Sequence, residues 1–436
     1  MENSSIRVLR KFVHQATRRV IAALPREARF AVYRSFVDCD PTPSDRLVLK
    51  IADSREELEA CFSLLHDAYV DSGFMQPDPS GMRVTIYHAL PTTTTLCAMW
   101  DGEVVGTISL IRESAFGFPL QKIFDLSAVR QKGGNLAEVS ALAVHPRFRK
   151  TGGAILFPLM KFMYEYATEY FDTRHLLIAV NPNRIEMYES LLFFGRLTAN
   201  VVENYDFANG APAVGATLDL YQAPGVMAHA YANKPMRKNL LAYFTKIRLA
   251  NIKLPNRRYF TTNDPVLTPE LLDYFFNQRT QAFASLDLRK QTLLHSIYDL
   301  PAYRSVLPDQ PSQQGGVQLR QHQRFSVKCP GRLRVDPVGT SSAEFEVQVI
   351  EVSEYGFQAY AKVELPLNIW SLATVYLGKA EMSVIKALAV RDKANGFNGF
   401  YGFRVGEPDL IWKKFVNALN QGRTHEDLEH ATMFLA

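Results

Sequence analysis

The sequence predicts an α/β domain with a helical extension, followed by a six-stranded β-barrel that a helix closes. Three observations predict this arrangement. Helix and strand patterns alternate over residues 47–222, which is typical of helices packed on one open sheet. Residues 223–306 have mostly helical patterns. After a stretch rich in proline, glutamine, serine and glycine at residues 307–318, short strand patterns recur with turns between them, as in a small barrel.

Local signals place the first elements. Residues 54–69 predict a helix, with Ser54 as the N-cap and Glu57 in the capping-box position. Asp101 and Gly102 are a strong signal for a hairpin turn. The remaining elements of this domain alternate in type: strands at 95–100, 103–111, 138–144 and 176–180, and helices at 155–170 and 184–194.

The later elements follow from the same patterns. Helices are expected at residues 237–247 and 269–284, and the helix that closes the barrel at 410–419. The six barrel strands are expected at 325–335, 344–352, 356–361, 373–377, 383–391 and 399–405. The domains that result are a basic segment at 1–46, the α/β domain at 47–222, the helical extension at 223–306, the linker at 307–318, the barrel at 319–422 and a tail at 423–436.

Composition excludes several classes of protein. The 436 residues are 47% hydrophobic and 21% charged, which excludes a mainly disordered chain. The four cysteines lie far apart without a CxxC pair, so neither a disulfide scaffold nor a zinc site is predicted. No stretch approaches the roughly 20 apolar residues that span a bilayer. We expect a cytoplasmic protein with reduced thiols and no bound metal.

The net charge of +5 is concentrated at the N-terminus. Residues 1–36 hold eight basic and two acidic residues, so this segment carries +6 and the rest of the chain −1. A DNA- or RNA-binding body is therefore not expected. Apolar residues at helical spacing leave two interpretations. Either the segment lies on the inner face of an anionic membrane, or it packs on its own protein with the arginines facing water.

The most informative motif is a strand at residues 138–144 that leads into a basic, glycine-containing turn. Gly152 and Gly153 let the backbone approach a ligand closely, and the free N–H groups at a helix start bind anions. Arg149 and Lys150 add positive charge. The turn is either a phosphate site or an ordinary connection from a strand to a helix.

The order of the motifs favours the first interpretation. Arg149-x-x-Gly152-x-Ala154 after such a strand, then Asn181 at a strand end and Tyr188 in the next helix, resembles the GNAT acyltransferase superfamily. That resemblance implies a sheet that separates after the donor strand, a pantetheine arm in the space, and a phosphate held by the turn. The acyl-donor-binding residues it implies are Leu142, Val144, Arg149, Gly152, Gly153, Ala154 and Asn181. Pro158, early in the next helix, departs from the pattern because it removes a hydrogen bond.

Within this superfamily, residues 47–300 resemble the N-acyl amino acid synthases of the FeeM type. The resemblance rests on His66-Asp67-Ala68-Tyr69 followed by Gly73-Phe74, the strand and turn described above, and residues 264–283. It implies a long-chain acyl donor, carried on acyl carrier protein or coenzyme A, and an amino-acid amine as acceptor. No permanently bound cofactor is expected.

Acyl carrier protein is acidic, and we expect basic residues around the donor entrance. Such charge would steer docking of the carrier; alternatively, the turn is simply a solvated basic surface. The basic residues concerned are Arg147, Arg149, Lys150 and Lys161.

Amide formation needs a neutral amine, so a base must take the amine proton. Glu138 lies where the related synthases place a functional acid, and we predict that it is this base; the alternative is a salt-bridged glutamate. Tyr188 is predicted to protonate the departing thiolate, unless it is only an aromatic packed in a helix face. A backbone N–H near Leu142 or Val144 would stabilise the oxyanion. His66, Asp67 and Arg83 are further candidates for the acceptor side.

A second motif pair lies in the barrel region. Arg320 and Arg324, with Glu351, Ser353 and Gly356 about thirty residues later, resemble the PilZ domain. The resemblance implies that these five residues bind cyclic di-GMP, and two guanidinium groups suit guanine edges and phosphates. Glu351 departs from the usual Asp or Asn. It either still accepts a guanine N–H or crowds the site and weakens binding.

Two hypotheses for the whole chain follow. The first is an N-acyltransferase of the GNAT-like fold that a PilZ-type barrel regulates through cyclic di-GMP. The alternative is a catalytically idle receptor for cyclic di-GMP that acts on a partner or a membrane surface.

Overall fold

The computed structural model describes residues 23–255, 257–261, 267–298, 301–309, 324–335, 342–392 and 399–420. It contains two compact units. The first comprises Met1–Arg83 and Thr95–Lys253, and the second comprises Val84–Thr94 and Leu254–Ala436. Some of the predictions fall outside the described residues. They concern the apolar residues at helical spacing before residue 23, most of the linker, and Arg320.

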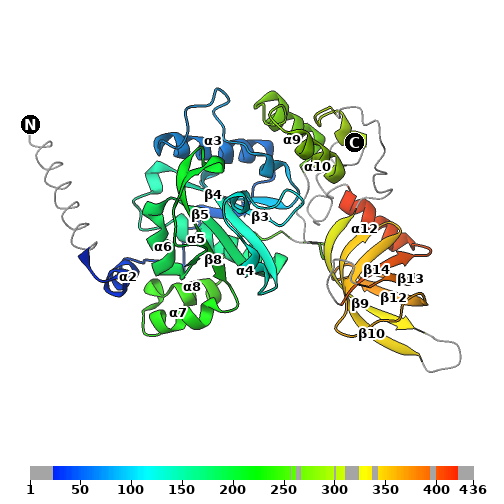
Figure 1. Cartoon of the computed structure of the whole chain (residues 1–436). Coiled ribbons are helices and arrows are strands. Elements are labelled where there is room, and N and C mark those ends of the chain that lie inside the picture. Colours follow the sequence, from blue (N-terminus) through cyan, green and yellow to red (C-terminus); the bar gives the residue numbers. More distant parts are fainter. Residues whose placement is uncertain are drawn as a thin grey trace, which may run out of the picture. The chain divides into compact units, whose positions relative to one another are not determined.

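The first unit is built on a mixed sheet with the strand order β1-β2-β3-β4-β5-β8-β6, with β7 paired to β8 (Figure 1). β4 and β5 pair in parallel with each other. On its other side, β4 pairs antiparallel with β3, and β5 pairs antiparallel with β8. The predicted α/β fold is therefore confirmed. The strands are β1 (Leu47–Ile51), β2 (Thr93–Trp100), β3 (Glu103–Arg112), β4 (Asn135–Val144), β5 (Thr173–Val180), β6 (Gly195–Arg196), β7 (Val202–Tyr205) and β8 (Ala211–Asp219).

Helices cover this sheet, and caps fix where they begin. Ser54 and Glu57 form the expected capping box at the start of α3. Asn239 caps α8, because its side chain accepts a hydrogen bond from Ala242 N. The expected helix at 237–247 is thus shorter, with a separate 3-10 turn before it. The helices are α2 (Arg26–Ser35), α3 (Arg55–Asp71), α4 (Ser127–Arg130), α5 (Leu156–Glu165), α6 (Pro182–Leu192), α7 (Ala223–Tyr231) and α8 (Leu240–Thr245).

The described part of the basic N-terminal segment packs on α6. Arg29 forms an ion pair of 2.6 Å with Glu186, and Arg26 one of 3.0 Å with Glu189. Arg34 donates to the carbonyl of Ser190 at 3.1 Å. Three of the eight basic residues are therefore held by the protein itself.

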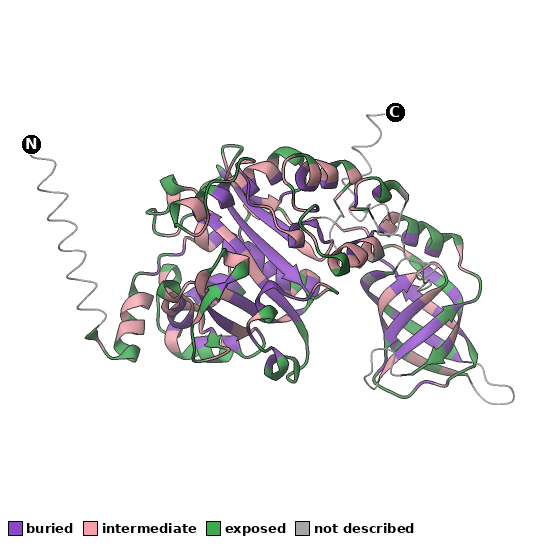
Figure 2. Cartoon of the chain, turned by 45° about the horizontal axis from the view of Figure 1, so that its top comes forward, coloured by how far each residue is buried: buried purple, intermediate pink, exposed green. Residues whose placement is uncertain are grey.

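The second unit contains the closed barrel, with the strand order β10-β11-β14-β13-β12-β9. Buried and more exposed residues alternate along the strands, as in Figure 2, because successive side chains point into and out of the barrel. All six predicted barrel strands are confirmed. They are β9 (Phe325–Val335), β10 (Ala343–Ser353), β11 (Gly356–Tyr360), β12 (Trp370–Tyr376), β13 (Met382–Arg391) and β14 (Phe400–Val405).

The predicted closing helix is α12 (Leu410–Asn420). Asp409 starts it by accepting from Trp412 N at 2.6 Å. Trp412 and Phe415 are fully buried in the barrel core. The indole of Trp412 also donates to the carbonyl of Ser353 at 3.1 Å, so this helix touches the loop that carries the second motif.

Short helices precede the barrel in the second unit. The helix expected at 269–284 is broken, because α9 (Pro269–Asp273) passes into a π-turn over Tyr274–Gln278. α10 (Leu288–Ile297) and α11 (Pro301–Arg304) follow. All four cysteines of the chain are buried and free. Within the described ranges, no helix is both long and apolar enough to cross a membrane.

Candidate functional site

β4 and β5 separate in the middle of the sheet. Their parallel pairing runs from Asn135 opposite Thr173 to Glu138 opposite Leu177. Beyond this point β4 pairs with β3, and β5 pairs with β8. A cavity of about 430 Å³ opens there, and residues of both strands beyond the separation line it. The structure thus contains the separated sheet that the superfamily resemblance implies.

A β-bulge lies in β4 beside this cavity. Thr107 faces Ala143 and Ser109 faces Ser140, so Ile108 lies opposite two residues of β4. Ala141 has a φ of 54°, which is unusual outside glycine. A bulge leaves a residue out of the ladder, so the N–H groups around Leu142 can face the cavity instead of β3.

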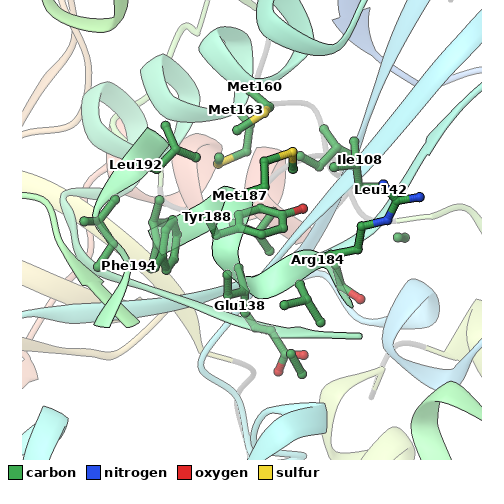
Figure 3. Close-up of a pocket in the computed structure, with 18 of the residues that line it drawn as sticks. Ile108, Glu138, Leu142, Met160, Met163, Arg184, Met187, Tyr188, Leu192 and Phe194 are labelled. Carbon is green, nitrogen blue, oxygen red and sulfur yellow. The ribbon is translucent and has the colours of Figure 1, made fainter. Parts of the chain in front are cut away.

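The cavity is mainly apolar on the side of α5 to α8. Side chains that can surround a hydrocarbon chain come from all four helices. Figure 3 shows several of them together with Glu138 and Tyr188. The apolar residues concerned are Met160, Met163, Leu192, Met227, Leu241 and Phe244.

Glu138 lies in this cavity with 2% of its surface exposed. Its carboxylate accepts a hydrogen bond of 3.1 Å from Leu120 N. No basic side chain among the described residues forms an ion pair with it, so the salt-bridged alternative has no partner there. Burial raises the pKa of Glu138 to about 8, and the bond from Leu120 opposes this rise only partly. The carboxyl group can therefore gain and lose a proton near neutral pH.

Tyr188 on α6 and Asn181, directly before this helix, also line the cavity. Burial raises the pKa of Tyr188, whose ring packs edge-on against Phe194 at 5.9 Å. Asn181 caps α6, because its side chain accepts from Asn183 N at 3.0 Å. Asn181 thus has a structural role beside the donor role that the resemblance implies.

The predicted phosphate turn follows β4 and leads to α5. Gly152 and Gly153 have φ values of 67° and 94°. Among the described residues, their N–H groups donate to no backbone carbonyl, so they remain available to an anion. α5 begins only at Leu156. Pro158 therefore lies in the first turn, where a helix has no use for its missing N–H, and it causes no departure from the fold.

The residues around the turn differ in whether they already have partners within the protein. Arg149 donates to the carbonyl of Val144 at 2.9 Å and lies 3.5 Å from Asp71, so it braces the end of β4. Arg147 is paired with Glu103 at 3.0 Å. Lys150, Gly152 and Ala154 are exposed. None of these residues, nor Gly153 or Val144, lines the cavity itself, whereas Leu142 does.

The expectation that Lys161 lies at the entrance is wrong. Lys161 is fully buried, because it is on the inner side of α5 and forms an ion pair of 2.7 Å with Glu165. It also donates to the carbonyl of Phe244 at 3.1 Å. A lysine one helical turn before a glutamate often forms such a pair, and that spacing was the available signal.

Sequence reasoning missed Arg184. This residue is exposed, lines the cavity, and lies on α6 one turn before Tyr188. Its positive charge favours the phenolate of Tyr188 and so opposes the rise in the tyrosine pKa. The spacing of four residues on one helix was the signal that could have identified it.

The three candidates for the acceptor side lie near α3. His66 contacts Asp67 at 2.9 Å and accepts from Asp78 N at 3.0 Å. These contacts tie the end of α3 to the following loop. Arg83 stacks on Tyr69 and Phe207, which both line the cavity.

A second cavity, of about 380 Å³, lies on the barrel and gathers the described residues of the second motif pair. Arg324 forms an ion pair of 2.6 Å with Glu351. Ser353 donates to the carbonyl of Gly356 at 3.0 Å. A Cβ at Gly356 would lie 2.9 Å from the carbonyl of Phe403, so close packing of the backbone requires glycine there.

Arg391 also lines this second cavity and was not predicted. β13 has a bulge between Ala389 and Arg391, and the side chain of Arg391 lies next to Gly402. Among the described residues, no carboxylate pairs with Arg391. In the sequence, Arg391 is only an arginine at the end of a strand, which is too common a feature to predict a binding site.

The separated β4–β5 pair, the bulge, the apolar cavity and a buried carboxyl group define the first unit as an acyltransferase domain. Residues 60–219 match the family model of the N-acyl amino acid synthase FeeM. The domain therefore has the GNAT-like fold, with N-acyltransferase activity, that the resemblance implied. The closed barrel with its helix is consistent with a PilZ-type domain. No curated protein sequence matches the chain.

Solved structures also resemble part of the chain. FeeM, an N-acyl amino acid synthase from uncultured soil microbes, is 26% identical over 41% of this chain and 94% of its own, with a TM-score of 0.36. The AHL synthase LasI is 13% identical over 41% of this chain and 91% of its own, with a TM-score of 0.33. BjaI, a CoA-dependent acyl-homoserine lactone synthase, is 17% identical over 48% of this chain and 95% of its own, also with a TM-score of 0.33.

Proposed function

We propose that this protein transfers a long-chain acyl group from a thioester donor to the amine of an amino acid. The observation that carries the proposal is the apolar cavity in the separated sheet, with the buried carboxyl group of Glu138 beside it. An apolar cavity of this size suits several methylene groups of an acyl chain. The carboxyl group supplies a base at the point where the two strands part.

The chain's own residues can perform each step. Glu138, once ionised, accepts the proton that the attacking amine loses as its nitrogen bonds to the thioester carbonyl carbon. The N–H groups of the bulge near Leu142 stabilise the oxyanion that forms. When the intermediate collapses, the C–S bond breaks and the thiolate leaves. Tyr188, whose raised pKa keeps its proton on the phenol, can protonate this thiolate; Tyr188 then regains a proton from solvent, and Glu138 releases the proton that it took from the amine.

The donor carries its thioester on a phosphopantetheine arm, as in acyl carrier protein or coenzyme A. We propose that the N–H groups of Gly152 and Gly153 hold the phosphate and that the arm enters between β4 and β5. The exposed Lys150 would favour an acidic carrier at this edge. Arg149 also braces the end of β4, because its Nε donates to the carbonyl of Val144.

The enzymatic proposal can be tested in cells that express the full chain. Organic extracts should contain N-acylated amino acids with the wild type and none with Glu138→Gln. Glu203→Gln, which changes an exposed glutamate of β7, is the control and should leave the product unchanged. Equal product from the wild type and Glu138→Gln would exclude Glu138 as the base. No product with the wild type would favour the idle-receptor alternative.

We further propose that the barrel cavity binds cyclic di-GMP and that binding regulates acyl transfer. The support is that Arg324, Glu351, Ser353 and Gly356 line one cavity. The guanidinium of Arg324 is already paired with Glu351, so the ligand must displace Glu351 or bind Arg324 beside it.

Calorimetric titration with cyclic di-GMP tests this second proposal. Arg324→Ala should abolish binding, whereas Arg332→Ala, an exposed arginine on β9 outside the cavity, should leave it unchanged. Absence of binding to the wild type would mean that Glu351 has closed the site. If binding leaves the acyl-transfer rate unchanged, the regulatory role is excluded.

A further inference from the structure

Arg83 has an unusual environment for a charged side chain. Only 5% of its surface is exposed. Its guanidinium lies 4.0 Å from the ring centroid of Tyr69 and 5.2 Å from that of Phe207. Two aromatic faces thus cover the charge, which favours a cation but does not neutralise it.

The hydrogen bonds of Arg83 are incomplete. Nη2 donates to the carbonyl of Phe207, whereas Nη1 is buried and has no hydrogen-bond partner. Among the described residues, no carboxylate forms an ion pair with Arg83. A buried charge without a counter-ion is costly, and proteins usually pair it. The arginine is therefore poised to bind an anion that the chain does not provide.

The position of Arg83 identifies that anion. Tyr69 and Phe207, whose rings cover the guanidinium, both line the cavity, whereas Arg83 itself does not, so the guanidinium lies directly behind this part of the wall. The neighbouring wall residues Ser72 and Tyr205 have polar tips, unlike the methionine- and leucine-rich side formed by α5, α7 and α8. The acyl chain suits that apolar side. The acceptor would then occupy the part of the cavity near Tyr69. An amino-acid acceptor brings one carboxylate with it.

We propose that Arg83 binds the carboxylate of the amino-acid acceptor and so makes the enzyme select amino acids over simple amines. A guanidinium suits this role because its planar fork can donate two parallel hydrogen bonds to one carboxylate. The bond to the Phe207 carbonyl and the two rings hold the fork in place. This inference rests on the proposed acyl transfer to an amine, and it adds how the acceptor is recognised.

The experiment compares acceptors that differ only in the carboxylate: leucine with isopentylamine, and phenylalanine with phenethylamine. The donor is a long-chain acyl thioester of N-acetylcysteamine, which has no phosphate, so an effect on a donor phosphate cannot contribute. In the wild type, kcat/KM should favour each amino acid. In Arg83→Gln, the KM for the amino acid should rise by about 10- to 100-fold, while the values for the amine stay within about 2-fold.

Arg83→Lys keeps the charge but loses the fork, and should give an intermediate loss. Arg112→Gln is the matched control, because Arg112 is also buried and lies over an aromatic ring, that of Phe171, which does not line the cavity, unlike Tyr69 and Phe207. It should leave the preference for amino acids unchanged. An equal effect of Arg83→Gln on acids and amines would overturn the proposal.

Two further readouts keep the inference separate from the proposed function. Calorimetry should show that leucine binds the wild type more tightly than isopentylamine does, even if turnover is absent, and that Arg83→Gln removes this difference. If no acceptor is acylated but this binding difference is found, the proposed function fails and the carboxylate site stands. If the wild type neither binds nor acylates the acids in preference to the amines, the inference fails, whether or not Arg83→Gln folds.

Discussion

At the scale of single residues, the chemistry depends on one buried carboxyl group. Glu138 is held in an apolar part of the sheet by one hydrogen bond from Leu120 N. Because burial opposes ionisation, it raises the pKa of this group from its usual 4.5 to about 8. A base whose pKa lies close to the working pH is effective in proton transfer.

The rate of acyl transfer should therefore depend on the ionisation of Glu138. After correction for the fraction of free amine, kcat/KM of the wild type should rise with pH through about 8 and then level off. Glu138→Gln should lower kcat about 100-fold or more and remove this rise. A corrected profile of the wild type that is flat between pH 6 and 9 would contradict the assignment of the base.

The same group should make stability depend on pH. Between pH 4.5 and about 8 the folded protein keeps the proton on Glu138, whereas the unfolded chain has lost it. The stability that this contributes is complete below pH 4.5 and is lost as pH rises through about 8. Glu138→Gln avoids this loss, so its advantage over the wild type in free energy of unfolding should grow with pH, to at most about 5 kcal/mol.

Urea unfolding of both proteins at pH 5 and pH 8.5 measures this difference. Glu203→Gln, at an exposed position, should show no such dependence. If the advantage of Glu138→Gln is equal at both pH values, the carboxyl group is not buried as described.

At the scale of elements, the turn between β4 and α5 positions the donor. Gly153 has a φ of 94°, and a Cβ there would lie 2.5 Å from the ring of Phe157. Gly153→Ala should therefore destabilise the protein by about 1–3 kcal/mol and displace the N–H groups of the turn. The KM for acyl-coenzyme A should rise, while that for the phosphate-free thioester should change little.

Gly81→Ala is the control for this change. Gly81 also has a positive φ, of 66°, but a Cβ there meets no atom within 4 Å. The backbone cost should be similar, and neither KM should change. Equal rises in the KM values for both donors in Gly153→Ala would show that the turn does not bind the phosphate.

The elements also show what the sequence can and cannot predict. The capping box at Ser54, the hairpin turn at Asp101 and Gly102, and the short strand patterns of the barrel are local signals, and all were confirmed. β8 was missed because its sequence contains proline and glycine, which are depleted in strands, and only its pairing with β5 makes it one. The bulge at Ala141 was missed for the same reason, since a bulge is defined by the partner strand.

The site was predicted in part. Glu138, Tyr188 and Asn181 were named from motifs, and the structure brings them into one cavity. Arg184 was missed, and Arg83 was named for the acceptor side without a position, because the places of both depend on residues far away in the chain. Lys161 was misplaced, since charge alone does not reveal which side of a helix faces the core.

At the scale of the whole molecule, the basic N-terminal segment has two candidate roles. Arg26, Arg29 and Arg34 of α2 already have partners on α6, which favours packing on the protein over contact with a membrane. If residues 1–22 pack on the protein as α2 does, the full chain and a variant without these residues will sediment equally with anionic vesicles. This deletion keeps α2 and its ion pairs intact. Loss of vesicle binding in the shortened variant would instead establish a membrane contact.

One assay of the purified full chain tests whether the first unit catalyses acyl transfer to amino acids. The protein is mixed with the common amino acids and a donor, which is either acyl carrier protein loaded with a long-chain acyl group or a long-chain acyl-coenzyme A. Thiol release and N-acylated products are followed by mass spectrometry. We expect thiol to be released in step with an N-acyl amino acid, and Glu138→Gln to stop both. Thiol release without any N-acylated product, or no release from either donor, would contradict this expectation.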